Sequence, residues 1–96
     1  MRTVNKVAID KKNEIEKLYE LIPLIQTKEE CQALFEDLCT YKEIEAMAQR
    51  LHAAELLLDG ITYEQIIEKT GISSATLSRV SKCVKFGTGY KKIFGK

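Results

Sequence analysis

The sequence is poor in residues that break helices or form special sites. It has no tryptophan, one proline, one histidine and five glycines among its 96 residues. So few prolines and glycines exclude collagen-like and low-complexity structure and leave little room for long loops. At 45% hydrophobic and 30% charged residues, the chain is expected to form one globular domain spanning residues 1–96.

The cysteines and the histidine argue against a disulfide-stabilised protein, a metal-binding protein and an enzyme. Cys31, Cys39 and Cys83 make an odd count without a C-x-x-C pair, which argues against a disulfide framework or a zinc site. His52 lacks a cysteine or acidic partner at metal-ligand spacing, so we expect it to be solvated. With no Ser/Cys–His–acid set that the spacing could support, we expect no enzyme, no metal and no cofactor.

Neither a membrane span nor an export signal is expected. No stretch approaches 18 apolar residues, and the first ten residues lack a long apolar core before a cleavage site. With an odd number of cysteines, this predicts a cytoplasmic protein.

The charge is divided unevenly along the chain. Residues 69–96 contain seven Lys/Arg and no Asp/Glu, whereas residues 1–68 have a net charge of −6. Such a basic segment attracts phosphates, because each neutralised phosphate releases condensed counterions. The alternative is a frayed basic tail or a solvated basic helix face.

Three capping boxes predict where helices begin. They are Thr27–Glu30, Thr40–Glu43 and Thr62–Gln65, and in each the threonine hydroxyl and the Glu/Gln side chain can exchange bonds with backbone amides. Apolar residues at helical spacing predict a first helix from about residue 10 to 21, a kink at 22–26 because of Pro23, and further helices from residues 27 and 40. Gly60 is expected to end the third.

The third helix is apolar on two sides. Ile44, Met47 and Leu51 belong to one stripe, and Ala46, Ala53 and Leu57 form a second one nearly opposite. Such a helix is usually sandwiched between two layers, and in a small chain one layer can come from a second copy. The alternative is that helices of the same chain cover both sides.

Residues 62–86 follow the helix-turn-helix plan of a short helix, a glycine turn and a second helix. Gly71 can adopt the positive φ of the turn, and Ser73 or Ser74 can cap the second helix. Four residues have the spacing of a small core that locks the two helices: Ile66, Ile72, Leu77 and Val80.

The second helix has an outer face on which small residues lead and cations follow. Small side chains let a helix N-terminus approach base edges, and Arg and Lys reach guanine or phosphate. The predicted DNA-binding residues are Ser73, Ser74, Ala75, Thr76, Ser78, Arg79, Lys82 and Lys85. The alternative function is a helical protein-interaction module that docks an acidic partner through this basic segment.

Cys83 is expected to be a small core residue, with a redox sensor as the alternative.

The segment from Gly71 to Lys85 resembles the helix-turn-helix of the Trp repressor family, and residues 38–51 resemble the segment that precedes it. The chain looks most like the YerC/YecD-like branch of that family. The resemblance implies an all-α fold of about five to six helices and an intertwined homodimer. Residues 10–59 would form the dimerisation helices, 62–86 the DNA-binding head and 87–96 a short C-terminal segment. It also implies a transcriptional regulator that acts as a repressor on a palindromic operator of double-stranded DNA, with half-sites about 34 Å apart.

The resemblance also implies an effector site. In the Trp repressor two arginines sandwich the indole of bound tryptophan, and motif matching places Arg50 and Arg79 there, with Thr40 and Thr76 as pocket threonines. Val80 and Cys83 stand where the family has a glycine and a serine, so the slot is narrower and tryptophan is not the expected co-repressor. Glu64 matches the family's base-contacting arginine, so a different operator is expected.

Overall fold

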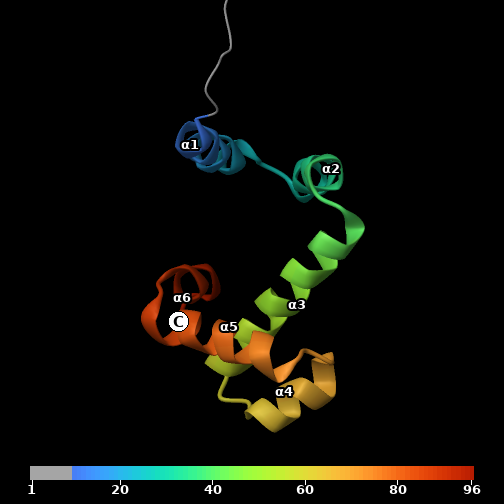
Figure 1. Ribbon diagram of the computed structural model, residues 1–96, viewed down its shortest axis with the longest axis vertical. Helices are drawn as coiled ribbons and strands as arrows, with labels where there is room; N and C mark the ends of the chain where they lie inside the picture. Colours follow the sequence, from blue (N-terminus) through green and yellow to red (C-terminus); the bar gives the residue numbers. More distant parts are fainter. Residues whose placement is uncertain (1–9) are drawn as a thin grey trace, which may run out of the picture. The chain divides into compact units, whose positions relative to one another are not determined.

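The computed structural model describes residues 10–96, which form six α-helices, one 3-10 helix and no strand (Figure 1). The expectation of an all-helical protein is therefore confirmed. The chain divides into two compact units after Leu38, and each is described by itself. None of the described helices combines the length and the apolar character needed to cross a membrane.

The first unit contains α1 (Lys11–Leu21), the 3-10 helix η1 (Ile22–Leu24) and α2 (Lys28–Leu38). Asp10 caps α1, because its side chain accepts a hydrogen bond from the Asn13 amide at 3.1 Å. Pro23 lies within η1, after which Ile25 has extended backbone. The predicted kink is confirmed, since proline cannot donate the hydrogen bond that would continue α1.

The start of α2 differs in one bond from the predicted capping box. The Thr27 hydroxyl accepts from the Glu30 amide at 3.0 Å, as expected. The Glu30 carboxylate accepts instead from the amide of Gln26, also at 3.0 Å, so the predicted return bond to Thr27 was wrong. The backbone amides just before a helix have no acceptor within the helix, so the carboxylate of a residue in the first turn can accept a hydrogen bond from any one of them.

The second unit contains α3 (Tyr41–Leu58), α4 (Tyr63–Thr70), α5 (Ser74–Phe86) and α6 (Gly89–Phe94). Thr40 and Thr62 begin α3 and α4 with complete capping boxes, as predicted. Figure 1 shows α5 crossing the C-terminal half of α3, and α3 contacts the three shorter helices. The core consists of Ala53, Ala54, Ile66, Ile72, Leu77, Val80 and Val84.

The four residues predicted to lock α4 to α5 are all buried, with at most 2% of their surface exposed. Each large apolar side chain removed from water in this way contributes about 1.5–3 kcal/mol. The predicted core of residues 62–86 is therefore confirmed, and it extends onto α3 through Ala53 and Ala54.

Only the C-terminal half of α3 is sandwiched. Ala53 and Ala54 are buried, and Leu56, Leu57 and Leu58 are partly buried against the core. Earlier in the helix, Leu51 is 44% exposed and Ala46 and Ala48 are exposed as well. The predicted second apolar layer is thus only partly supplied by the described residues of this chain.

The C-terminal segment forms α6 and packs back onto its own unit. Tyr90 and Phe94 lie against the core cluster. The Lys96 ammonium pairs with the carboxylate of Asp59, which follows α3. The short C-terminal segment expected over residues 87–96 is thus a helix whose aromatic residues contribute to the packing of the second unit.

Candidate nucleic-acid interface

The turn between α4 and α5 is held by hydrogen bonds around Thr70. Gly71 has φ +73°, the left-handed conformation that the sequence predicted. The Thr70 hydroxyl donates to the Ile66 carbonyl at 2.7 Å and accepts from the Ile72 amide at 3.1 Å. From α3, the side-chain amide of Gln49 donates to the Thr70 carbonyl at 3.0 Å. The turn is therefore tied both to α4 and to α3.

Ser73, rather than Ser74, caps α5. The Ser73 hydroxyl accepts from the Thr76 amide at 3.1 Å and also contacts the Thr76 hydroxyl at 2.9 Å. These two residues, both predicted to bind DNA, thus help to form the helix start. Ser74 occupies the first helical position and is exposed.

The two faces of α5 are divided as the sequence predicted. Leu77, Val80 and Val84 are buried against the core. The exposed residues on the outer face are Ser74, Ala75, Ser78, Arg79, Lys82 and Lys85. A helix held on one side by a core and exposing small residues and cations on the other can present that side to a groove of DNA.

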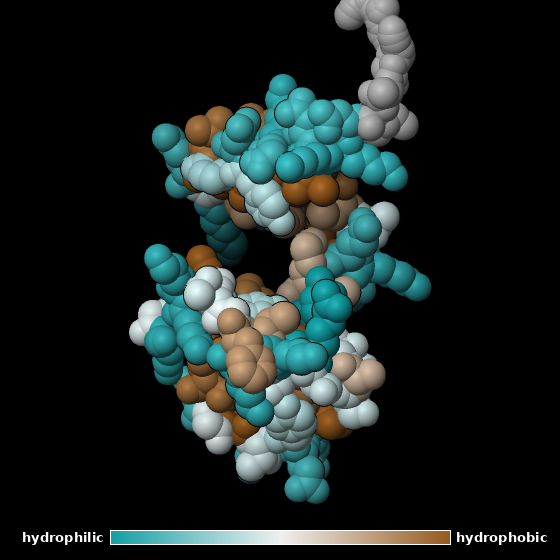
Figure 2. Space-filling view, turned by 60° about the vertical axis from the view of Figure 1, so that its left-hand side comes forward, coloured by the Kyte–Doolittle hydropathy of each residue, from teal (hydrophilic) through white to brown (hydrophobic). Residues whose placement is uncertain are grey.

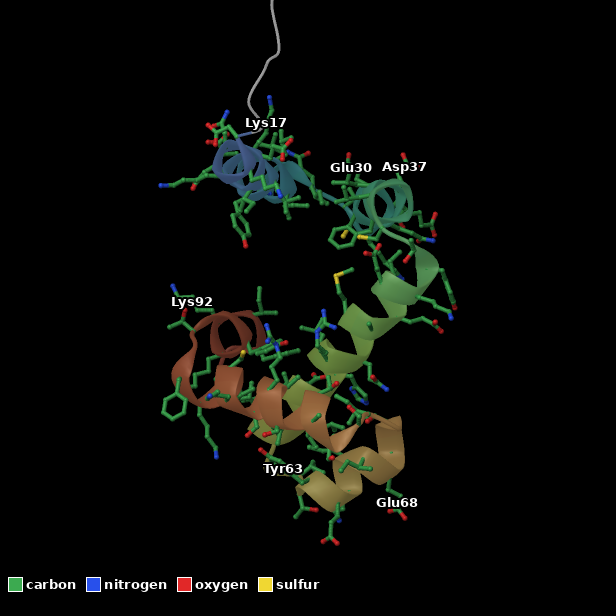
Figure 3. All side chains as sticks on the ribbon, viewed as in Figure 1. Lys17, Glu30, Asp37, Tyr63, Glu68 and Lys92 are labelled. Carbon is green, nitrogen blue, oxygen red and sulfur yellow. The ribbon has the colours of Figure 1, made fainter. Side chains whose placement is uncertain are left out.

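An open hollow of about 510 Å³ lies along this outer face. It is lined by five of the predicted residues and three others: Tyr63, Ala75, Ser78, Arg79, Ser81, Lys82, Lys85 and Phe86. Figure 3 shows Tyr63 at the start of α4 on the side of α5, whereas Glu68 lies toward the other end of α4. The lining includes three cations and no carboxylate, so the hollow suits an anion.

Sequence reasoning did not identify Tyr63, Ser81 and Phe86 as part of this surface. Tyr63 is 41% exposed and Phe86 is 81% exposed. Ser81 is only 5% exposed and is the one buried polar residue among the described residues. Its spacing of three residues from Ser78 was the available signal, because residues three apart are neighbours on a helix.

Cys83 is exposed, so its predicted place in the core was wrong. It lines a separate hollow of about 350 Å³ together with Gly87, Gly89, Tyr90 and others. The glycines that follow α5 carry no side chains that could cover the thiol. The helical angle placed Cys83 at the edge of the buried face, and the chain that follows leaves that edge open.

The residues matched to the effector site do not line a single hollow. Arg50 is half-buried and lines a hollow of about 230 Å³ with Cys39, Glu43, Ala46 and Met47. Arg79 lines the hollow at α5, while Thr76 is bonded to Ser73. Thr40 caps α3 next to the Arg50 hollow.

His52 is exposed, and its ring lies 3.9 Å from the Glu55 carboxylate. Within residues 10–96, no three His, Cys, Asp or Glu side chains lie together in a way that could hold a metal ion.

An all-helical unit in which a short helix, a glycine turn and a second helix expose a basic face has the architecture of helix-turn-helix DNA-binding regulators. Comparison with known proteins agrees with this class. The profile of the Trp repressor protein family matches residues 13–96, so the chain belongs to the Trp repressor family. The fold and the family together indicate a DNA-binding transcription regulator.

Three similar proteins support this assignment. The uncharacterized protein YerC of Bacillus subtilis is 45% identical over 74 residues, which are 77% of this chain and 71% of YerC. A TrpR-like protein of Eubacterium eligens is similar in structure, with a TM-score of 0.81 and 38% identity over 86% of this chain and 87% of that one. A candidate Trp repressor of Staphylococcus aureus has a TM-score of 0.81 and 36% identity over 86% and 84% of the two chains.

Proposed function

We propose that the protein is a sequence-specific repressor that binds a palindromic operator in double-stranded DNA as a homodimer. The observation that carries the proposal is the outer face of α5, where exposed small residues precede exposed cations on a helix anchored by a buried core. The small residues Ser74 and Ala75 allow close approach to base edges. Arg79 can donate two hydrogen bonds to guanine or hold a phosphate.

The charge distribution supports nucleic acid as the partner. The basic segment 69–96 contains seven cations and no Asp or Glu of its own, and of these cations Lys96 pairs with Asp59. No carboxylate lines the hollow at α5. Binding by such a surface should weaken steeply with salt, because counterions are released from the DNA. An acidic protein partner would not require the small residues that lead α5.

A second copy is proposed because the first unit, as far as residues 10–38 describe it, buries none of its apolar side chains. Within α1, η1 and α2 no residue is buried, and the most exposed large apolar side chains include Ile15, Leu18, Leu21, Leu24 and Leu38. Figure 2 shows such hydrophobic side chains in brown on the surface. Exposed apolar surface of this extent marks an interface, and a second copy would cover it and give the protein two heads for two half-sites.

The proposed co-repressor site is the one that the family match implies, at Arg50, Arg79, Thr40 and Thr76. Arg50 and Arg79 line different hollows of this chain, so a ligand that contacts both would have to reach from one hollow to the other. Val80 is larger than the glycine that the family has at this position and would narrow a slot for an indole, so tryptophan is not the proposed ligand. Calorimetry with aromatic amino acids and other small metabolites tests this, and heat with tryptophan alone would contradict it.

The proposal is tested by selecting duplexes from a random DNA library with the purified protein. We expect the bound sequences to share an inverted repeat whose half-sites lie about one helical turn apart. On the selected operator, Arg79→Ala should weaken binding by about 1–3 kcal/mol.

Lys42→Ala is the matched control, because Lys42 is an exposed cation of α3 that lies outside the hollow and outside the basic segment 69–96. It should leave the affinity nearly unchanged. Selection without any shared sequence, together with binding to an acidic protein that depends on the same cations, would favour the interaction module and overturn the repressor.

A further inference from the structure

We propose that the hollow along the outer face of α5 binds a free nucleoside phosphate, which competes with operator DNA for this surface and so releases the protein from the operator. The inference rests on the proposed function and adds a regulator to it. It starts from the aromatic rings of the hollow, because a duplex presents no unstacked base to them.

Two aromatic side chains stand exposed in the lining of this basic hollow. Phe86 is 81% exposed, and Tyr63 is 41% exposed. Lys82 lies four residues before Phe86, so its ammonium and the Phe86 ring are neighbours on α5. An unstacked base packs on such rings, whereas the bases of a duplex already stack on one another. The rings therefore favour a ligand that carries a free aromatic ring system.

The charged residues of the hollow define the other part of the ligand. Arg79, Lys82 and Lys85 line it, and no carboxylate does. Ser78, Lys82 and Lys85 follow one another at helical spacing, so a hydroxyl and two ammonium groups occupy one stripe of α5. Such donors match the oxygens and the charge of a phosphate group. A ring and a phosphate together describe a nucleotide.

Ser81 provides an independent sign that the hollow takes a ligand. It is 5% exposed and lines the hollow, yet the side-chain hydrogen bonds around α4 and α5 join other residues and leave its hydroxyl without a partner in the described chain. Buried hydroxyl groups are normally hydrogen-bonded. A phosphate or ribose oxygen seated in the hollow would supply the missing acceptor.

The size of the hollow favours one nucleotide over a nucleic-acid strand. Its volume of about 510 Å³ lies in the usual range for sites of small ligands. A single strand stacks successive bases on a series of rings along a groove, but Tyr63 and Phe86 are the two aromatic residues in the lining. We therefore assign the hollow to a mononucleotide.

The position of the hollow makes this ligand a competitor of DNA. Ala75 and Ser78 line the hollow and also belong to the face proposed to enter the groove. A nucleotide that fills the hollow would thus occupy space that a bound duplex needs. The effect is opposite to that of a co-repressor, and the site does not include Arg50 or Thr40.

Calorimetry with the full chain tests the site without DNA. The probes are ADP and GDP, compared with adenosine, which lacks the phosphates, and with pyrophosphate, which lacks the ring. We expect a diphosphate to bind at least about 10-fold more tightly than either part, because ring and phosphate both contribute. Equal binding of pyrophosphate would reduce the hollow to a simple anion site and overturn the inference. Neither heat nor a thermal shift with either diphosphate at millimolar concentration would also overturn it.

Three variants locate the binding. Phe86→Leu keeps an apolar side chain but removes the ring, and should raise the nucleotide Kd about 10-fold while leaving pyrophosphate binding unchanged. Ser81→Ala should raise the nucleotide Kd about 10-fold, because a hydrogen bond to a charged group is lost. Lys85→Met should weaken the binding of both nucleotide and pyrophosphate.

Two controls match these changes. Tyr41→Leu removes a ring that is 75% exposed and lies outside the hollow, and Lys42→Met removes an exposed cation of α3. Both should leave the nucleotide Kd within about twofold. Effects as large as those of Phe86→Leu and Lys85→Met would overturn the assignment to the hollow. Thermal unfolding identifies misfolded variants, and Phe86→Leu keeps the test valid if Ser81→Ala does not fold.

Competition on the selected operator tests the regulation. A nucleotide at about ten times its Kd should raise the apparent Kd for the operator about 10-fold. Simultaneous binding of nucleotide and operator, with neither affinity changed, would overturn the release. A short single strand of thymidines that binds through Phe86 more tightly than any nucleotide would assign the hollow to single-stranded DNA and overturn the inference.

The two proposals fail in different ways. If the protein selects an operator but binds no nucleotide, only this inference fails. If no duplex is selected, the proposed function fails, and the direct titration alone decides whether the nucleotide site exists.

Discussion

At the scale of single residues, Gly71 decides whether α4 can turn into α5. Its φ of +73° is a conformation that costs other residues about 1–2 kcal/mol. No atom lies within 4 Å of the place that a side chain would occupy. The need for glycine here is therefore conformational and does not arise from crowding.

Gly71→Ala should lower the free energy of unfolding by about 1–2 kcal/mol, measured by urea denaturation at a fixed protein concentration. Gly89→Ala is the control, because Gly89 also has open space around it but lacks a positive φ. It should be neutral or stabilise by about 0.4–1 kcal/mol. Equal effects at the two positions would show that backbone conformation is not the cause.

At the scale of elements, one hydrogen bond joins α3 to the turn of the DNA-binding head. The side chain of Gln49 reaches the carbonyl of Thr70, which lies at the end of α4 and is 21 residues away in sequence. Both groups are partly buried, so the bond is shielded from competition with water. It helps to set the orientation of α4 and α5 on α3.

Gln49→Met keeps the side-chain length but removes the donor, and should cost about 1 kcal/mol of unfolding free energy. Hydrogen exchange at the Gly71 and Ile72 amides should also become faster. Gln32→Met is the matched control, because the exposed bond from Gln32 to Glu36 lies within one helix. Gln32→Met should change the free energy of unfolding by less than about 0.5 kcal/mol. A larger effect of Gln32→Met than of Gln49→Met would contradict a stabilising role for the bond from Gln49 to the turn.

At the scale of the whole molecule, stability should depend on a second copy. The described helices of the first unit bury no side chain, and Ile15 and Leu18 are 53% and 41% exposed. A short chain buries a modest share of its surface, which makes it marginal without a partner. The proposed dimer would supply the missing burial.

The melting temperature should therefore rise with protein concentration, by about 4 °C for each tenfold increase. Leu18→Glu should lower the melting temperature and the apparent mass in solution, because it places a charge in the proposed interface. Asn13→Glu adds the same charge at an exposed polar position of α1 and should change neither. A melting temperature independent of concentration would contradict the dimer.

Local sequence was sufficient for most of the architecture. Short sequence signals predicted the helix boundaries: the capping boxes at Thr40 and Thr62, the proline at position 23 and the glycine at position 71. Each of them acts within a few residues, because it depends on a local capping bond, on the missing amide hydrogen of proline or on a positive φ. The alternation of apolar and polar residues placed the two faces of α5, because a helix has a constant period. The resemblance to the Trp repressor family rested on the same short segments.

The lining of the hollow and the exposure of Cys83 depended on tertiary structure. Tyr63 comes beside Ser81 only because α4 folds back on α5, and Cys83 is left open because Gly87 and Gly89 cannot cover it. Periodicity states which side of a helix a residue occupies but not what stands opposite that side. Contacts between elements distant in sequence, such as Gln49 with Thr70, therefore follow from the packing of the helices and not from any local pattern.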